Sequence, residues 1–183
     1  KMTPVGYNRK AVDEAGRLFY YQSEEEVQRK RIEGYKKRDK RRFTFAHMRN
    51  IREVTGNLSN KLCGYVLLLQ PYVQYKSNLL VTQGKNPKPL DRKGIAKIFG
   101  IHPKHAKKAL DKLEEAGIVE TTDDGHFRMN DRYHFRKKAG RDADMLIKTF
   151  HTTLKALNLS PAEMGFLYKL LPYVHYDTNL ICA

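Results

Sequence analysis

Apolar positions recur at helical spacing in the middle of the chain, beginning near residue 58. Ser59 is a residue type that caps helix N-termini, and the positions after it fit a largely buried helix. Its apolar residues are Leu62, Cys63, Val66, Leu67, Leu69 and Val73. Pro71 lacks a backbone donor, so it is expected to kink this helix or end it early. The segment "NLLV" at 78–81 then predicts a short apolar strand.

Two further helices are predicted after a polar loop at residues 82–89. Asp91 can cap the first helix, which should end near Phe99 because Gly100 follows. The second helix begins around Pro103, a favoured first-turn residue, and runs to residue 116. Its apolar residues follow the i, i+3, i+4, i+7 pattern: Ala106, Ala109, Leu110 and Leu113. "IVET" and "HFRM" then predict two strands joined by a tight turn in "TDDG".

The chain contains an internal sequence repeat. Residues 69–81 read "LQPYVQYKSNLLV", and residues 170–182 read "LLPYVHYDTNLIC". The residues shared with the second copy are Pro71, Tyr72, Val73, Tyr75, Asn78 and Leu79. Upstream of them, Leu58, Ser59 and Gly64 match Leu159, Ser160 and Gly165. Before the second copy, "ADMLIKTFHTTLKAL" at 143–157 is predicted to form an amphipathic helix.

The order of the predicted elements between residues 58 and 130 is that of a helix-turn-helix followed by a β-wing. We therefore expect a mainly α protein with a small β-wing, in which residues 43–138 form a winged helix-turn-helix domain. Residues 139–183 are expected to hold the first helices and the first strand of a second, incomplete copy. We expect the natural protein to continue into a second helix pair and wing.

Charge indicates the class of partner. The 183 residues include 35 Lys and Arg against 20 Asp and Glu, which gives a formal net charge of +15. An excess of this size speeds encounter with polyanions. Nucleic acid, acidic lipid and acidic protein are therefore the partners to consider.

Residues 1–42 are predicted to be a basic N-terminal arm. In this arm "DEAG" at 13–16 can turn a β-hairpin that places Tyr7 near Phe19 or Tyr21. Ser23, followed by three glutamates, suits a helix N-terminus. Residues 29–42 then hold nine Lys or Arg and few apolar side chains, so this segment cannot bury much surface. It is expected to contact nucleic acid.

The helix at 103–116 carries its basic residues opposite its apolar stripe. A helix that lies in the DNA major groove needs a cationic face, since phosphates flank it on both sides. The contacts predicted there are Lys104, His105, Lys107, Lys108 and Lys112. Further predicted contacts are Arg92, the wing residues His126 and Arg128, and the arm residues Lys37, Arg38, Arg41 and Arg42. Asp123 and Asp124 at the tip of the 122–128 wing would repel phosphate unless they turn away.

Three segments resemble a known family. "NLLV", "PLDRKGIAKIFGIHPKHAKKALDKLEEAGIVE" and "TTDDGHFRMN" are similar to the first strand, the helix pair and the wing of winged helix-turn-helix DNA-binding proteins. The groups concerned are the MarR-like regulators and the RepL-like replication proteins of Firmicute phages and plasmids. The resemblance spans residues 58–130 and implies a winged-helix fold that binds DNA. His102-Pro103 replaces the Ser or Thr that usually starts the recognition helix, so no target sequence carries over.

Other function classes find little support in the sequence. The longest apolar run, at 63–69, is about a third of a bilayer span, and the N-terminus lacks the apolar segment of a signal peptide. Cys63 and Cys182 lack metal-ligand spacing and are interpreted as reduced core thiols of a cytoplasmic protein. Phosphate-binding loops, dinucleotide fingerprints and nucleophile–base pairs are absent, so we expect neither an enzyme nor a cofactor. Four tyrosines are predicted to pack in a core or an interface: Tyr72, Tyr75, Tyr173 and Tyr176.

The sequence as a whole predicts a protein that binds double-stranded DNA, namely a sequence-selective transcriptional regulator that reads the major groove with helix 103–116. Two alternatives stay open. A phage or plasmid replication initiator would bind origin repeats, which tandem winged helices also suit. An assembly or adaptor protein would dimerise through helices 143–176. A homodimer is a further candidate partner, because symmetric operators need one, whereas no membrane, metal or small-molecule ligand is expected.

Overall fold

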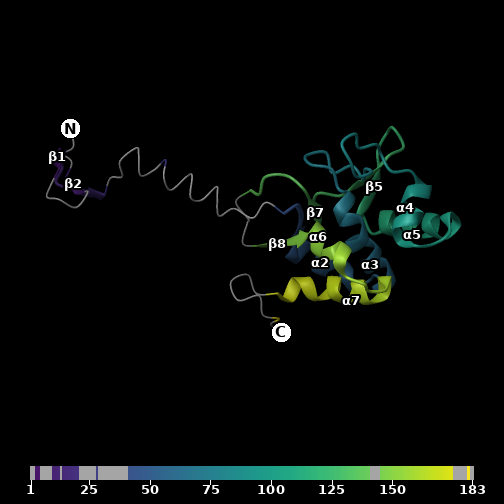
Figure 1. Ribbon diagram of the computed structural model, residues 1–183. Coiled ribbons are helices and arrows are strands. Elements are labelled where there is room, and N and C mark those ends of the chain that lie inside the picture. Colours follow the sequence, from purple (N-terminus) through teal and green to yellow (C-terminus); the bar gives the residue numbers. More distant parts are fainter. Residues whose placement is uncertain are drawn as a thin grey trace. The chain divides into compact units, whose positions relative to one another are not determined.

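The computed structural model describes residues 3–4, 10–12, 14–20, 28, 41–140, 145–174 and 181. The chain divides into two compact units, residues 1–40 and residues 41–183. In the described residues the protein is mixed α/β, with short helices and small antiparallel sheets (Figure 1). None of the described helices has the length and apolar character needed to cross a membrane.

The first unit holds a small antiparallel sheet of three strands, β1 (Thr3–Pro4), β2 (Lys10–Val12) and β3 (Leu18–Tyr20). β2 pairs with β3, and the turn between them contains Gly16 at a φ of +74°, a conformation that glycine adopts without strain. The hairpin predicted around residues 13–16 is therefore confirmed. Several other expectations for the arm fall on residues outside the described ones: Tyr7, Tyr21, the helix start at Ser23, Lys37 and Arg38.

The buried helix predicted after Ser59 is α3 (Asn60–Leu69). The Ser59 hydroxyl accepts a hydrogen bond from the backbone N–H of Leu62 at 3.3 Å, so Ser59 caps the helix as expected. After α3 the chain tightens into the short 3-10 helix η1 (Gln70–Tyr72), which contains Pro71. The early end that Pro71 predicts is confirmed. Cys63 is buried in α3 as a free thiol, and burial raises its pKa.

The predicted helix pair is also present, with its caps. The carboxylate of Asp91 accepts from the backbone N–H of Gly94 at 2.7 Å and starts α4 (Arg92–Phe99). Gly100 ends α4 in the left-handed region, at a φ of +66°. α5 (Pro103–Glu115) begins after His102, whose Nδ1 accepts from the backbone N–H of Lys104 at 3.2 Å. An imidazole therefore supplies the cap that Ser or Thr would otherwise provide.

A β-hairpin follows α5, as predicted. β5 (Val119–Thr121) pairs antiparallel with β6 (Phe127–Met129), and the turn contains Gly125 at a φ of +74°. The segment 78–81 adds to the outer side of β6. The N–H of Leu80 donates to the carbonyl of Phe127 at 2.8 Å, and the N–H of Met129 donates to the carbonyl of Asn78 at 3.0 Å. The expected strand thus lies beside the hairpin.

A second sheet lies at the other end of the unit, with strand order β7 (His134–Phe135), β4 (Phe43–His47), β8 (Leu146–Phe150). The prediction of one helix over 143–157 is wrong, because β8 is a strand and only α6 (His151–Ala156) is helical. β8 pairs with β4 along its whole length, from Phe43↔Phe150 to His47↔Leu146. The available strand edge therefore decides the conformation of a segment whose local pattern also fits a helix.

The repeat in the sequence corresponds to a repeat in space. β4, α2 (Met48–Thr55), α3 and η1 recur in the same order as β8, α6, α7 (Pro161–Leu170) and η3 (Leu171–Tyr173). The two copies pack against each other, with β4 antiparallel to β8 and α3 beside α7 (Figure 1). α2 contacts η3, and α6 contacts η1. Because the α2–η3 and α6–η1 contacts are exchanged between the copies, and β4 and α3 meet their own counterparts, the copies are related by an approximate two-fold axis.

The axis passes near the crossing of α3 and α7, where backbone meets backbone. A Cβ on Gly64 would overlap the carbonyl oxygen of Pro161, and a Cβ on Gly165 would overlap that of Asn60. Gly64 and Gly165 are equivalent positions of the two copies, as are Asn60 and Pro161. Only glycine permits this approach.

Two cation–π contacts join the copies symmetrically. The Arg52 guanidinium lies 5.0 Å from the ring centroid of Tyr173, and the Lys155 ammonium lies 5.8 Å from that of Tyr72. The interface packing predicted for Tyr72 and Tyr173 is therefore confirmed. For Tyr75 it is wrong, because its side chain is 54% exposed in the turn that follows. Tyr176 and Cys182 lie outside the described residues.

Buried histidines complete the interface. His134 Nε2 lies 2.7 Å from the hydroxyl of Tyr168 on α7, and both side chains are fully buried. His151 Nε2 lies 2.8 Å from the hydroxyl of Thr44 on β4. Burial lowers the pKa of His134 to about 3. Burial, assisted by nearby cations, lowers the pKa of His151 to about 4. Both imidazoles are therefore neutral at pH 7.

The close crossing of α3 and α7 at Gly64 and Gly165 predicts that a single added methyl group at Gly64 destabilises the folded protein. Gly64→Ala should lower the free energy of unfolding by about 3 kcal/mol, because the new Cβ meets backbone that cannot move aside. Gly56→Ala is the matched control, since Gly56 has helical dihedrals and an open Cβ position. It should be neutral or stabilising by up to about 1 kcal/mol. Urea denaturation measures both variants, and equal stability of the two would contradict the crossing.

The buried histidines predict a loss of stability in mild acid. Both pKa values lie below the ordinary value of 6.5 in the folded protein, so the unfolded chain binds more protons below that pH. The stability is full above about pH 6.5 and falls by about 1.4 kcal/mol per pH unit and histidine as the pH drops towards 4. Urea titrations between pH 7.5 and 5 measure this pH dependence, and His151→Gln should remove about half of the slope of unfolding free energy against pH. A free energy of unfolding that did not change with pH would exclude this role of the histidines.

Candidate nucleic-acid interface

The exposed face of α5 carries a row of lysines. Four buried residues hold the opposite face to the core: Ala106, Ala109, Leu110 and Leu113. Lys104, Lys108 and Lys112 are spaced four residues apart, so they follow one ridge of the helix at intervals of about 6 Å along its axis. All three are exposed, and within residues 41–140 and 145–174 no carboxylate pairs with any of them. We call these three residues the lysine row.

The other predicted contacts on α5 differ from the lysine row. Lys107 forms an ion pair with Asp111, one turn along the helix, at 2.9 Å. Its charge is therefore partly compensated. His105 is exposed near the start of α5, with its ring 6.5 Å from that of His102. The five predicted residues of α5 thus all reach the surface, but they are not equivalent in charge.

A groove runs between α3 and α5, on one flank of the lysine row. Its lining residues are Ser59, Lys61, Leu62, Tyr65, Ile101, His105, Lys108, Ala109 and Lys112. Lys61 lies in the first turn of α3 and was not among the predicted contacts, because it is far from α5 in the sequence. The groove brings it to the same surface as Lys108 and Lys112. The one available signal in the sequence was a lysine two positions after the helix cap Ser59.

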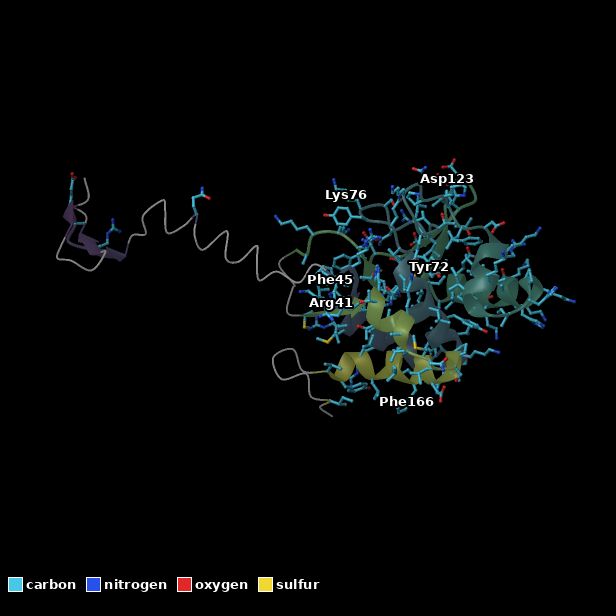
Figure 2. All side chains as sticks on the ribbon, in the orientation of Figure 1. Arg41, Phe45, Tyr72, Lys76, Asp123 and Phe166 are labelled. Atoms are coloured by element: carbon cyan, nitrogen blue, oxygen red, sulfur yellow. The ribbon has the colours of Figure 1, made fainter. Side chains whose placement is uncertain are left out.

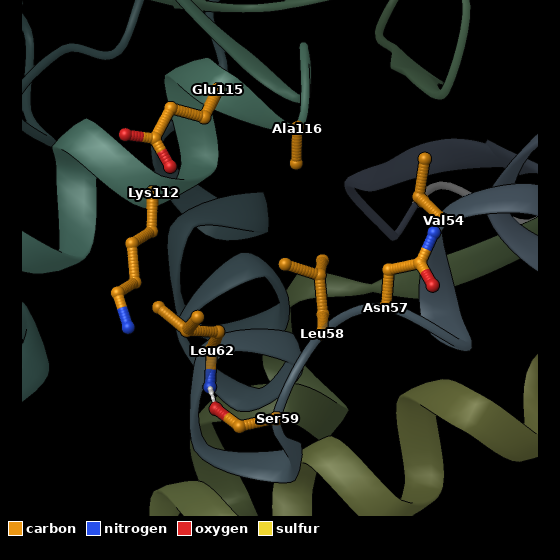
Figure 3. Close-up of a pocket in the computed structure, with 8 residues that line it drawn as sticks. All are labelled: Val54, Asn57, Leu58, Ser59, Leu62, Lys112, Glu115 and Ala116. Carbon is orange, nitrogen blue, oxygen red and sulfur yellow. Dashed lines mark hydrogen bonds between the residues drawn. The ribbon is translucent and has the colours of Figure 1, made fainter.

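A second pocket continues this groove towards the loop between α2 and α3 (Figure 3). Its lining residues are Val54, Asn57, Leu58, Ser59, Leu62, Lys112, Glu115 and Ala116. Figure 3 shows the capping hydrogen bond from Leu62 to Ser59 within this lining. Lys112 lines both pockets, whereas Glu115 is acidic. The cationic surface therefore ends near the last turn of α5.

The opposite flank of α5 faces the β5–β6 hairpin and is much less cationic. Arg128 forms an ion pair with Glu120 across the two strands at 2.7 Å. The Thr121 hydroxyl donates to the Glu114 carboxylate and joins β5 to α5. Asp123 and Asp124 are exposed at the tip, and Figure 2 shows Asp123 at the edge of the molecule. The predicted contact Arg128 therefore has its charge compensated in place.

The remaining predicted contacts are spread over the surface. His126 is half-buried in the turn just before β6, and Arg92 is exposed at the first position of α4. Neither residue lines the α3–α5 groove. Arg41 lies over the ring of Phe150, at 4.0 Å from its centroid, beside the β4–β8 pair. The carbonyl of Arg42 accepts from the N–H of His151. In Figures 1 and 2 this sheet and Arg41 lie at the other end of the unit from α5. These predicted contacts therefore do not share a surface with the lysine row.

Comparison with known proteins finds no matching family model, curated protein or solved structure. Within the described residues, no group of three His, Cys, Asp or Glu side chains is placed to hold a metal ion. The functional assignment therefore depends on the geometry of the lysine row and its two flanks.

Proposed function

We propose that residues 60–129 form a winged helix-turn-helix that binds double-stranded DNA, with α5 as the recognition helix. The observation that carries the proposal is the lysine row, which the apolar face of α5 holds outward without carboxylate partners among the described residues. The B-DNA major groove admits one α-helix, and a helix lying there has phosphates on both sides. The left-handed Gly100 between α4 and α5, and the hairpin directly after α5, suit the same arrangement.

The position of each lysine along α5 suggests its role. Lys104 lies in the first turn, and in helix-turn-helix proteins the N-terminal residues of the recognition helix contact base edges. Lys108 and Lys112 lie further along and share the groove with Lys61 of α3. These three are expected to contact the phosphates of one strand.

The two flanks of α5 differ in charge, and this difference suggests from which side the DNA backbone approaches the helix. The α3 flank offers four basic side chains in one groove, whereas the hairpin flank has the Arg128–Glu120 pair and two aspartates at its tip. In this proposal the DNA backbone therefore approaches α5 from the α3 side. The wing contributes little to the affinity, although the sequence suggested otherwise.

A pair of double variants tests the recognition helix. Lys104→Ala with Lys108→Ala should weaken binding to duplex DNA at least tenfold and reduce the magnitude of the salt slope by about 0.9 for each phosphate that the protein no longer neutralises. Lys107→Ala with Arg128→Ala removes the same formal charge from residues that already have ion-pair partners. This control should weaken binding less than about threefold. Fluorescence anisotropy between 50 and 300 mM salt, on duplexes that the unmodified protein selects, provides both values. Equally weakened binding in the two double variants would refute the assignment.

For the biological role we propose a sequence-selective regulator of transcription. The internal repeat favours replication initiation as a second candidate, since two related modules in one chain suit repeated origin sites. A genome-wide footprint in the native host separates them. A regulator should occupy promoters, and an initiator should occupy clustered repeats at an origin. If the protein showed no salt-sensitive affinity for DNA, both the regulator and the initiator hypotheses would be excluded. An assembly protein would then be the remaining candidate.

A further inference from the structure

The outer face of the β7–β4–β8 sheet carries a group of phenylalanine rings. Side chains that pair directly across an antiparallel ladder lie on the same face of the sheet. Phe43 pairs with Phe150 on β8, and their ring centroids are 5.9 Å apart. Phe45 pairs with Phe135 on β7, and these centroids are 5.2 Å apart. The Phe43 and Phe45 centroids are 4.9 Å apart, so the four rings form one group, which we call the phenylalanine cluster.

The two faces of this sheet have different environments. Thr44 lies between Phe43 and Phe45 in β4, so its side chain is on the opposite face, where it is fully buried. Its hydroxyl donates to the carbonyl of Gln70 in η1, which belongs to the core side. Phe43, Phe45 and Phe150 are only half-buried. The outer face therefore presents adjacent aromatic rings to the surface, a feature typical of interaction sites.

Cations lie over these rings. The Arg41 guanidinium is 4.0 Å from the ring centroid of Phe150, and the Lys148 ammonium is 5.1 Å from that of Phe43. Lys148 pairs with Phe45 in the sheet register, so it belongs to the outer face. It is exposed, and within residues 41–140 and 145–174 no carboxylate forms an ion pair with it. The aromatic face is therefore also cationic (Figure 2).

Two arginines lie close together beside the phenylalanine cluster. Arg42 directly precedes β4, and Arg136 directly follows β7. Partial burial, together with the nearby Arg42 cation, lowers the pKa of Arg136. Two cations held near each other repel, and an anion beside them relieves this repulsion. Lys137 differs from them, because it forms an ion pair with Asp131 at 2.7 Å. The surface next to the rings thus favours a negatively charged ligand.

We propose that the outer face of the β7–β4–β8 sheet binds single-stranded nucleic acid. Unpaired bases stack on the phenylalanine cluster, while Lys148 and Arg42 contact the phosphates. The Arg41 guanidinium extends the stacking surface, since its plane also stacks on bases. Every base has a π-face, so this mode of binding needs no particular sequence. Bases in a duplex already stack on one another, so duplex DNA is not the ligand of this face.

The combination of rings and cations selects this class of ligand. An acidic peptide would satisfy the cations but has few planar groups to stack on four rings. A lipid surface would need apolar side chains that project from the protein, whereas these rings are half-buried. The site is separate from the proposed duplex site, because the sheet and Arg41 lie at the other end of the unit from α5 (Figures 1 and 2). The inference therefore does not depend on the role of the lysine row.

Tryptophan fluorescence tests the stacking directly. The chain contains no Trp, so Phe45→Trp introduces a single reporter into the phenylalanine cluster. Phe166→Trp is the matched control, because Phe166 lies on α7 and is 57% exposed. An oligo(dT) or oligo(U) of about 12 nucleotides should quench the Phe45→Trp emission by roughly half and leave the control unchanged. Quenching by either strand supports the proposal, and the stronger one identifies the sugar. No quenching at position 45, or equal quenching at both positions, would overturn it.

Conservative substitutions separate stacking from packing. Phe45→Leu keeps an apolar side chain but removes the ring, so it should weaken oligo(dT) binding at least fivefold. Phe45→Tyr retains a ring and should bind within about twofold of the unmodified protein. Lys148→Gln should reduce the magnitude of the salt slope by about 0.7, whereas Lys97→Gln, at an exposed position on α4, should not. Fluorescence anisotropy gives these values, and thermal unfolding monitors the fold. Unchanged affinity in a folded Phe45→Leu variant would overturn the proposal.

Cross-tests keep this site distinct from the duplex site. Lys104→Ala with Lys108→Ala should lose duplex affinity but keep oligo(dT) binding, and Phe45→Leu should show the reverse. If the α5 variant lost oligo(dT) binding while Phe45→Leu kept it, the lysine row would bind both ligands and this proposal alone would fail. Polyglutamate of equal charge is the probe for an acidic peptide. Displacement of oligo(dT) by polyglutamate as effectively as by unlabelled oligo(dT) would also overturn the proposal.

Discussion

The close crossing of α3 and α7 is the contact on which the rest of the second unit depends. Gly64 and Gly165 let two helix backbones meet at carbonyl oxygens, so the copies approach without intervening side chains. That approach aligns β4 with β8 over their whole length and encloses His134 against Tyr168. It also fixes which face of α3 remains for α4 and α5. The position of the lysine row therefore follows from a contact on the other side of α3.

Local pairing decides which charges of a basic protein are available. The net charge of +15 predicts a polyanionic partner but does not identify its binding surface. Ion pairs engage Lys107 and Arg128, whereas Lys108 and Lys112 of the lysine row share a groove with Lys61 and have no such partners among the described residues. The uncompensated positive charge is therefore concentrated on the α3 side of α5 rather than spread evenly over the surface. In the proposed complex the hairpin can therefore carry aspartates at its tip, because the DNA backbone approaches from the α3 side.

The two copies show how one sequence motif can have two environments. Both have the strand, the two helices and the terminal 3-10 turn, and both end in the same antiparallel bridge. Only the first is covered by a helix pair within the described residues.

The sequence by itself determined the features that depend on neighbouring residues. Caps at Ser59 and Asp91, the stop at Gly100, the stripe of α5 and the turn before β6 are local, because each depends on dihedral preferences and spacing within a few residues. Tertiary structure decided the features that need a distant partner. β8 became a strand because β4 offered an edge, and Lys61 lies near Lys108 and Lys112 because α3 and α5 line the same groove. The compensation of Arg128 by Glu120 depends on the register of the hairpin, and the exposure of Phe166 depends on which elements cover each copy. Such contacts join positions that hydrophobic spacing alone does not relate.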